Sequence, residues 1–286
     1  MRIIYIIIGL MSFVMVRADF MKPYAEPKDS ETVVKWLDEA RHQERTINFP
    51  LFFARKFLGR PYVAYTLEVF DGEERLVVNT RELDCTTLVE NVTALTLCAY
   101  RNLYTYRDYL NALVSMRYRR GVIDRYPSRI HYFSDWILEN TASGIVNEIQ
   151  SPIPPFSDVQ TIMVDYMSRH PHSYKALRLH PEFVSEISQM EQKLSGRQFR
   201  YVPKVEVKNT KAMRDAVHDG DIIAITCNKP GLDIAHLGFA VWREDGLHLL
   251  NASQLHKCVV EEPMTLGQYL QKHSSHTGIR IIRINK

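Results

Sequence analysis

Apolar residues recur at the spacing of helices through the first two thirds of the chain. The longest such pattern predicts a buried helix that begins near Cys85 and continues to about Ala99. Two extended segments are predicted at residues 62–70 and 76–78. Shorter helical patterns predict further helices over Ser30–Ala40, Phe52–Leu58, Tyr109–Tyr118, Ile162–His170 and His180–Leu194.

The last third of the chain changes to the two-residue alternation of β-strands. Asp245-Gly246 separates an alternating segment, His236–Trp242, from a second one, Leu247–Ala252, and this dipeptide is a strong hairpin signal. Helices followed by strands with tight turns predict an α+β fold with an antiparallel sheet. The remaining predicted elements are strands at Ile222–Ile225, Val259–Val260 and Ile279–Ile284 and a short helix at Thr265–His273.

The N-terminus has the pattern of a secretory signal peptide. Arg2 precedes an apolar run, Ile3–Val16, which is short for a membrane span, and Ala18 is a small residue before a cleavage point. An uncleaved anchor is the alternative. Cleavage after Ala18 would leave residues 19–286, which we expect to form one exported domain without stable membrane insertion.

Composition narrows the class of protein without naming a function. The chain has 45% hydrophobic and 24% charged residues, the composition of an ordinary globular protein. Its 36 basic and 33 acidic residues leave a net charge of +3, so no nucleic-acid partner is expected. Four cysteines without C-x-x-C spacing, and a His170-Pro171-His172 segment without a third ligand, predict no metal site. We expect no cofactor.

Cys85 is the first candidate for chemistry, because it follows Asp84 at the start of the predicted buried helix. Free backbone N–H groups and the positive end of the helix dipole lower a thiol pKa there. The same N–H groups can stabilise an oxyanion during acyl transfer. The alternative is a small buried apolar residue.

His236 and Asn251 supply the groups that a nucleophilic cysteine needs. Alternation places His236 with Gly238 and Ala240 on one face of its strand, which we expect to face the helix that begins at Cys85. Asn251 lies on the neighbouring strand across the hairpin, where its oxygen can fix the imidazole tautomer. The alternative is a core histidine and a turn asparagine.

These motifs together resemble a known family. Their arrangement is similar to the N-acetylmuramoyl-L-alanine amidase-like branch of the NlpC-type, papain-like cysteine peptidases and amidases. The resemblance extends from about Phe52 to the end of the chain, and the block around Cys85 is its most specific part. The motifs are Leu58-Gly59-Arg60-Pro61-Tyr62, Arg81–Asn91, His236–Ala240 and Leu250–Ser253.

The resemblance implies a papain-like core and a role for each site residue. Cys85 would be the nucleophile, His236 the base and Asn251 the residue that orients it, where the family often has a second histidine. The oxyanion and substrate residues would include Tyr62, Asp84 and Thr86, although Asp84 could equally serve only as a helix N-cap.

The implied reaction is hydrolysis of the amide between N-acetylmuramic acid, in its 1,6-anhydro form as one candidate, and L-alanine in peptidoglycan fragments. The family's bacterial setting places this reaction in the periplasm, and we expect a monomer. One alternative is an endopeptidase that cuts the peptide stem after D-glutamate. Another is a catalytically silent wall-binding domain.

Several residues keep two interpretations. Trp136 could stack on a sugar face or lie in the core. Glu82 and Glu90 could form a carboxylate pair for sugar hydrolysis, but nothing in the sequence fixes the distance between them.

Residues 100–215 are expected to form a helical insertion that shapes the substrate groove. Cys98 is expected to be a core thiol. Cys227 and Cys258 could form a disulfide if their strands are neighbours.

Overall fold

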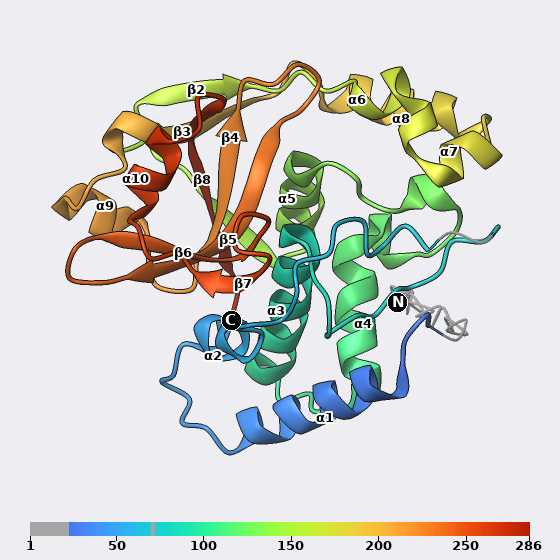
Figure 1. The fold of residues 1–286 in the computed structure, drawn as a ribbon, viewed down its shortest axis with the longest axis horizontal. Coiled ribbons are helices and arrows are strands. Elements are labelled where there is room, and N and C mark those ends of the chain that lie inside the picture. The colour runs from blue at the N-terminus through green and yellow to red at the C-terminus, as the bar shows by residue number, and fades with distance from the viewer. Residues whose placement is uncertain (1–22, 70–71) are drawn as a thin grey trace, which may run out of the picture.

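An eight-stranded antiparallel sheet forms the centre of the computed structural model, which describes residues 23–69 and 72–286. Seven strands follow the order β2-β3-β8-β4-β5-β6-β7, and β1 also pairs with β8 (Figure 1). The mixed α+β architecture and the antiparallel sheet agree with the sequence prediction. The strands are β1 Val146–Ile149, β2 Asp158–Thr161, β3 Gln198–Pro203, β4 Ile222–Cys227, β5 Ile234–Trp242, β6 Leu247–Ser253, β7 Cys258–Glu261 and β8 His276–Ile284.

Helices pack on both faces of this sheet (Figure 1). The central one is α3 (Cys85–Tyr100), which contacts α1, α2, α4 and the strands β5 and β6. It is the buried helix predicted from the sequence. The other α-helices are α1 Pro27–Arg41, α2 Phe49–Lys56, α4 Tyr106–Arg117, α5 Phe133–Ala142, α6 Tyr166–Arg169, α7 Lys175–Leu179, α8 Phe183–Leu194, α9 Lys211–Ala216 and α10 Leu266–Gln271.

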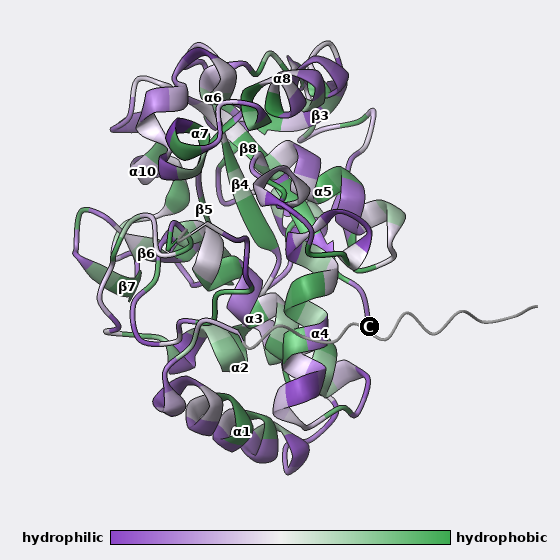
Figure 2. Ribbon diagram, turned by 90° about the vertical axis from the view of Figure 1, so that its right-hand side faces the viewer, coloured by the Kyte–Doolittle hydropathy of each residue, from purple (hydrophilic) through white to green (hydrophobic). Residues whose placement is uncertain are grey.

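The two faces of β5 contact different cores. Leu237, Phe239 and Val241 pack in the core that contains α3. Ala240 packs in a second core with α9 and α10 on the opposite face. The expectation that the face of β5 with His236 and Ala240 lies toward α3 is therefore wrong. The larger apolar side chains of the other face pack against α3 instead. Figure 2 shows how apolar the central strand β4 is between these cores.

Residues 100–215 contain α4 to α8, most of α9 and also three strands of the sheet. Strands β1 and β3 both pair with β8, so this interval contributes to the central sheet as well as to helices. Helices α6, α7 and α8 lie together at one end of the molecule (Figure 1) around a third, smaller core. That core includes Met167, Leu177 and Ile187.

Other sequence predictions differ from the structure or lie outside it. Residues 62–69 of the predicted segment 62–70 hold a turn and no strand, because Tyr62 alone among them makes an isolated bridge, to Leu83. The predicted signal peptide and its cleavage point lie outside the described residues. Among residues 23–69 and 72–286, no helix is long and apolar enough to cross a membrane.

The predicted disulfide is wrong. Cys227 on β4 and Cys258 on β7 are both free thiols, and β5 and β6 separate their strands. Three strand spacings amount to roughly 14 Å, beyond the distance that a disulfide can bridge. Cys98 is buried in the helical core, as the sequence predicted.

Candidate functional site

Cys85 is the first residue of α3, and Asp84 is its N-cap. The Asp84 carboxylate accepts a 2.8 Å hydrogen bond from the Thr87 backbone N–H, and the Thr87 hydroxyl accepts one from the Asp84 N–H. This capping box fixes where the helix begins. It leaves the N–H groups of the first residues pointing out of the helix end beside the Cys85 side chain.

His236 and Asn251 form a direct hydrogen bond between β5 and β6. The His236 Nε2 atom lies 2.9 Å from the Asn251 Oδ1 atom, and the Asn251 amide nitrogen donates to the Leu249 carbonyl at 3.4 Å. Because Oδ1 can only accept, Nε2 carries the proton and Nδ1 is left as an acceptor. Asn251 is fully buried, so this orientation is held firmly.

Cys85 is partly buried, and burial raises the pKa of its thiol to about 12. The Asp84 carboxylate raises this pKa further. Hydrogen bonds from the Leu237 backbone N–H and the Thr86 side chain lower it but do not compensate. The cysteine therefore rests as a neutral thiol at neutral pH.

Burial also lowers the pKa of His236, while the hydrogen bond to Asn251 and the Glu262 carboxylate raise it. A neutral imidazole in the same cavity as a neutral thiol has the correct protonation state for general-base chemistry. Proton transfer would then accompany attack by the sulfur rather than precede it.

Cys85 and His236 line one cavity of about 300 Å³. Three of the other predicted residues, Asp84, Thr86 and Trp136, also line it. Trp136 is only 1% exposed, and Phe133 stacks on it with ring centroids 4.9 Å apart. The structure therefore favours the core interpretation of Trp136 over a sugar platform.

Tyr62 and Asn251 are not among the residues that line this cavity. Burial raises the pKa of the Tyr62 hydroxyl, and Cys85 and Asp84 lie close enough to raise it further. The Tyr62 hydroxyl therefore stays protonated and can donate a hydrogen bond near the sulfur.

Sequence reasoning missed much of the cavity wall. Tyr65 is 75% exposed and adopts a left-handed backbone conformation with a φ of 63°, which is uncommon for a bulky residue. Arg129 lies 2.5 Å from the Glu68 carboxylate across the wall. No local pattern marks these residues, because they come together only in the fold. The residues not predicted include Tyr65, Glu68, Arg129, His131, Tyr174 and Asp233.

Another missed group lies on the far side of His236. The ring of Tyr269, on α10, stacks 6.4 Å from the His236 ring, and His273 and His276 lie behind it. The position of Tyr269 depends on α10 covering this face of the sheet, which the sequence did not indicate.

The carboxylate pair considered for sugar hydrolysis does not form a site. Glu90 is 1% exposed and accepts a 2.7 Å hydrogen bond from the buried Arg117 guanidinium. It is not among the residues that line the cavity, and neither is Glu82. Among the described residues, no group of three or more histidine, cysteine or acidic side chains could hold a metal ion.

A family model described as N-acetylmuramoyl-L-alanine amidase-like (AmiA-like) matches residues 52–279 of this chain. This interval holds the Cys85 helix, His236, Asn251 and most of the sheet. The chain belongs to the AmiA-like family. A comparison with curated proteins finds no match.

Solved structures agree with this AmiA-like assignment. The chain is 42% identical to an N-acetylmuramoyl-L-alanine amidase from Bacteroides uniformis, with a TM-score of 0.77, over 83% of this chain and 98% of that one. It is 39% identical to a protein from Bacteroides fragilis described as a putative xylanase, with a TM-score of 0.75, over 81% and 99% of the two chains.

A third solved structure shares the fold at low sequence identity. Protein LPG0564 from Legionella pneumophila is 19% identical to this chain, with a TM-score of 0.70, over 91% of this chain and 95% of that one. At that identity the likeness concerns the fold alone. The family match and the similar Bacteroides uniformis structure together support an amidase-like hydrolase.

Proposed function

We propose that this protein is a cysteine amidase that hydrolyses the bond between N-acetylmuramic acid and L-alanine in peptidoglycan fragments, the 1,6-anhydro form included. The observation that carries the proposal is the shared cavity of Cys85, at the start of α3, and His236, whose Nε2 atom is held by Asn251. The similar structure from Bacteroides uniformis, described as an N-acetylmuramoyl-L-alanine amidase, supports the choice of bond.

The first half of the reaction forms a thioester. The Cys85 sulfur attacks the lactyl carbonyl carbon of the muramoyl group while His236 Nδ1 takes the thiol proton. The tetrahedral intermediate then collapses, the C–N bond breaks, and the imidazolium returns the proton to the departing L-alanine nitrogen. The stem peptide leaves with a free amino terminus.

The second half returns the enzyme to its starting state. Neutral His236 takes a proton from water, and the resulting hydroxide attacks the thioester carbonyl. The C–S bond breaks, the muramic acid carboxylate forms, and the Cys85 thiol is restored by the proton from His236.

Two donors are placed to stabilise the oxyanion. The Cys85 N–H is one of the free donors at the start of α3, where the helix dipole favours negative charge. The Tyr62 hydroxyl stays protonated because its pKa is raised. Donors already fixed by the fold need no reorganisation when the charge develops.

Asn251 replaces the second histidine that NlpC-type enzymes often carry. Its amide oxygen orients the imidazole without titrating. We also propose that the protein is exported to the periplasm, where peptidoglycan fragments are found, on the basis of its N-terminal pattern.

Product analysis tests the choice of bond. The purified mature protein would be incubated with a muropeptide, its 1,6-anhydro form and the free stem peptide, and the products identified by mass spectrometry. We expect N-acetylmuramic acid with a free carboxylate and an intact stem that begins with L-alanine. Cleavage after D-glutamate would instead identify an endopeptidase, and uncleaved substrates would indicate a binding domain.

A further inference from the structure

A second cavity, larger than the catalytic one, lies between α5, α8 and residues 119–128. It has a volume of about 800 Å³ and shares no lining residue with the catalytic cavity. Helix α5 separates the two, since Phe133 and Trp136 line the catalytic cavity while Asp135 and Glu139 line this one. We call it the α5–α8 cavity.

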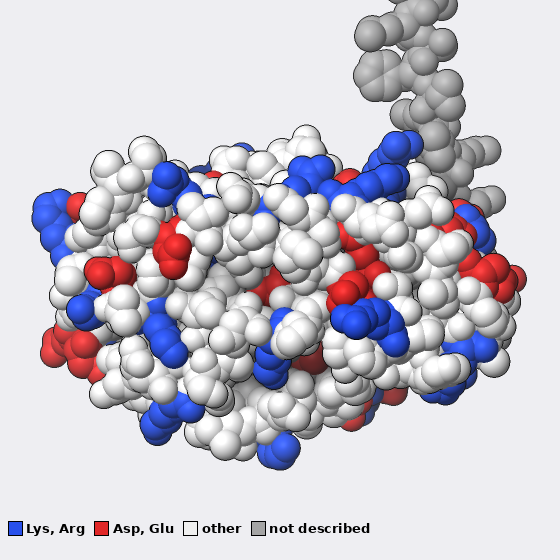
Figure 3. Space-filling model, turned by 90° about the horizontal axis from the view of Figure 1, so that it is seen from above, with Lys and Arg blue, Asp and Glu red and all other residues white. Residues whose placement is uncertain are grey.

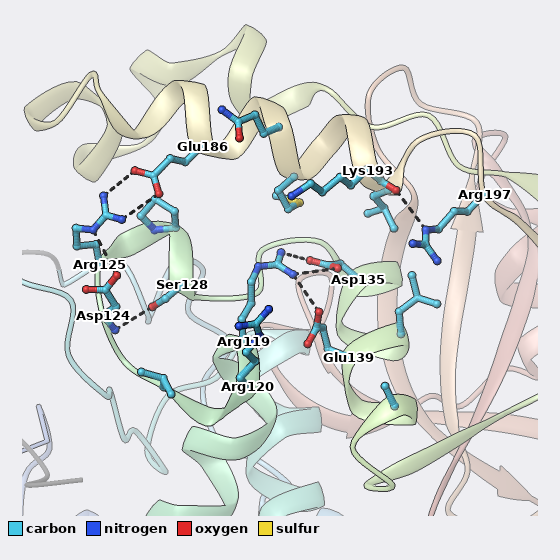
Figure 4. A pocket seen from close by; sticks show the side chains of 17 residues that line it. Arg119, Arg120, Asp124, Arg125, Ser128, Asp135, Glu139, Glu186, Lys193 and Arg197 are labelled. Atoms are coloured by element: carbon cyan, nitrogen blue, oxygen red, sulfur yellow. Dashed lines mark hydrogen bonds and ion pairs between the residues drawn. The ribbon is translucent and has the colours of Figure 1, made fainter. Parts of the chain in front are cut away.

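All four carboxylates that line the α5–α8 cavity are already paired. Arg119 bridges Asp135 and Glu139 on α5 (Figure 4). On the opposite side Arg125 pairs with Glu186 of α8 at 2.6 Å and with Asp124 at 3.4 Å. The four acidic side chains therefore share two of the five cations in the wall, and the wall as a whole carries one more positive than negative charge.

Three cations remain without a carboxylate partner among the described residues: Arg120, Lys193 and Arg197. Figure 4 shows Arg120 beside Arg119 on one wall, with Lys193 and Arg197 on the wall formed by the end of α8. The Arg197 Nε atom donates to the Lys193 carbonyl at 3.2 Å, which keeps these two residues together. The cavity thus presents, from two sides, three cations that make no ion pair with a carboxylate of the described residues.

The backbone at Arg120 adds an independent observation. Arg120 has φ and ψ of 56° and 20°, and Gly121 follows with a φ of 65°, so two successive residues are left-handed. This conformation is sterically strained for an arginine, whereas a glycine would adopt it freely. Strained non-glycine residues of this kind cluster at ligand sites.

Apolar side chains form most of the rest of the wall, which also contains Ser128 and Gln189. Val122 and Pro127 come from the loop, Leu138 from α5 and Met190 from α8. A cavity with cations at its rim and apolar side chains between them suits an organic anion with a carbon framework better than a free ion. On the face of the molecule seen from above in Figure 3, positive and negative side chains are interspersed.

We propose that the α5–α8 cavity binds a ligand that carries several carboxylate or phosphate groups, with Arg120, Lys193 and Arg197 as its anion-binding residues. Arginine guanidinium groups bind both kinds of anion through paired N–H donors, and lysine contributes a point charge. The site is separate from the proposed active site, so the proposal does not depend on the hydrolytic reaction.

Isothermal titration calorimetry with two probes, tripolyphosphate and citrate, tests the proposal on the full mature chain. The test variant carries Arg120→Gln, Lys193→Gln and Arg197→Gln. The control variant carries Arg107→Gln, Lys208→Gln and Lys272→Gln, which removes the same charge from exposed positions outside the cavity. Preference for one probe tells a phosphate ligand from a carboxylate ligand.

We expect wild type and control to bind one probe alike, and the test variant to bind it about tenfold more weakly or worse. Muropeptide hydrolysis should be the same in all three proteins. A single variant, Arg120→Gly, removes the side chain and the backbone strain together, and should weaken binding while leaving the fold intact. Failure of wild type to bind either probe, or equal weakening in the control, would overturn the proposal.

Discussion

Asp84 caps the helix that begins at Cys85, and its carboxylate also raises the pKa of the Cys85 thiol. The first effect favours catalysis by the site, and the second disfavours formation of the thiolate. The cap holds the free N–H groups of α3 in place for an oxyanion, whereas the negative charge disfavours a thiolate before substrate arrives. The resting site therefore holds a thiol that is protected from adventitious oxidation or alkylation.

Replacing Asp84 separates the cap from the charge. Asp84→Asn keeps a good N-cap residue but removes the charge, so the Cys85 pKa should fall with little change in stability. The rate of alkylation by iodoacetamide against pH measures this pKa. Asp84→Ala should instead cost about 1 kcal/mol of stability, because the cap is lost. An unchanged alkylation profile in Asp84→Asn would show that the carboxylate does not act on the thiol.

Asn251 should act as a positioning residue for His236. Asn251→Ala removes the acceptor for Nε2–H and should lower kcat by roughly one to two orders of magnitude, with a smaller effect on KM. Asn251→Asp restores an acceptor and adds a charge that favours the imidazolium. The acid limb of kcat/KM, set below 6.5 in wild type by the lowered pKa of His236, should then move to higher pH. A purely structural role for Asn251 would leave that limb in place.

Buried histidines should make the protein less stable in mild acid. Burial, with the nearby His273, lowers the pKa of His276 to about 4, whereas an unfolded histidine titrates near 6.5. The unfolded chain therefore binds the extra proton as the pH falls from about 6.5 to about 4, and the free energy of unfolding decreases over that range. Above it, both states are neutral and stability is at its full value.

Urea unfolding of wild type and His276→Gln at pH 7 and pH 4.5 measures this contribution. The variant should lose less stability between the two pH values than wild type does. His172→Gln, at an exposed position, is the matched control and should behave as wild type. Equal losses in wild type and His276→Gln would contradict the assignment to His276.

The buried pair of Glu90 and Arg117 should be structural. Both side chains are 2% exposed, and the Arg117 guanidinium also donates to the Val77 carbonyl at 2.6 Å. Arg117→Met strands a buried carboxylate and should cost about 3–5 kcal/mol in urea unfolding, whereas Glu90→Leu with Arg117→Met should recover part of that loss. Glu90→Gln should still hydrolyse muropeptides under conditions where it is folded, and its complete inactivity there would reopen a carboxylate mechanism.

The Cys85 helix and the hairpin that joins His236 to Asn251 could be predicted because their signals are local. A capping residue before an apolar helical pattern marks the start of α3, and Asp245-Gly246 between alternating segments marks the turn between β5 and β6. The same hairpin brings His236 and Asn251 within hydrogen-bond distance.

The missed features depend on contacts between distant parts of the chain. Alternation along β5 defines two sets of residues but not which set meets α3, and α10 on the other face decides it. The strand order, which no local pattern in the sequence indicates, places Cys227 and Cys258 too far apart to pair. Tyr65 and Arg129 reach the cavity through turns that carry no sequence pattern.

The rate at which L-alanyl peptide is released from a 1,6-anhydro muropeptide, by wild type and by Cys85→Ala, tests the central claim most directly. Circular dichroism would establish that the variant is folded. We predict measurable release by wild type and at least a thousandfold lower rate for Cys85→Ala, since an attacking sulfur has no substitute in the cavity. Release by folded Cys85→Ala at the wild-type rate would contradict the cysteine mechanism.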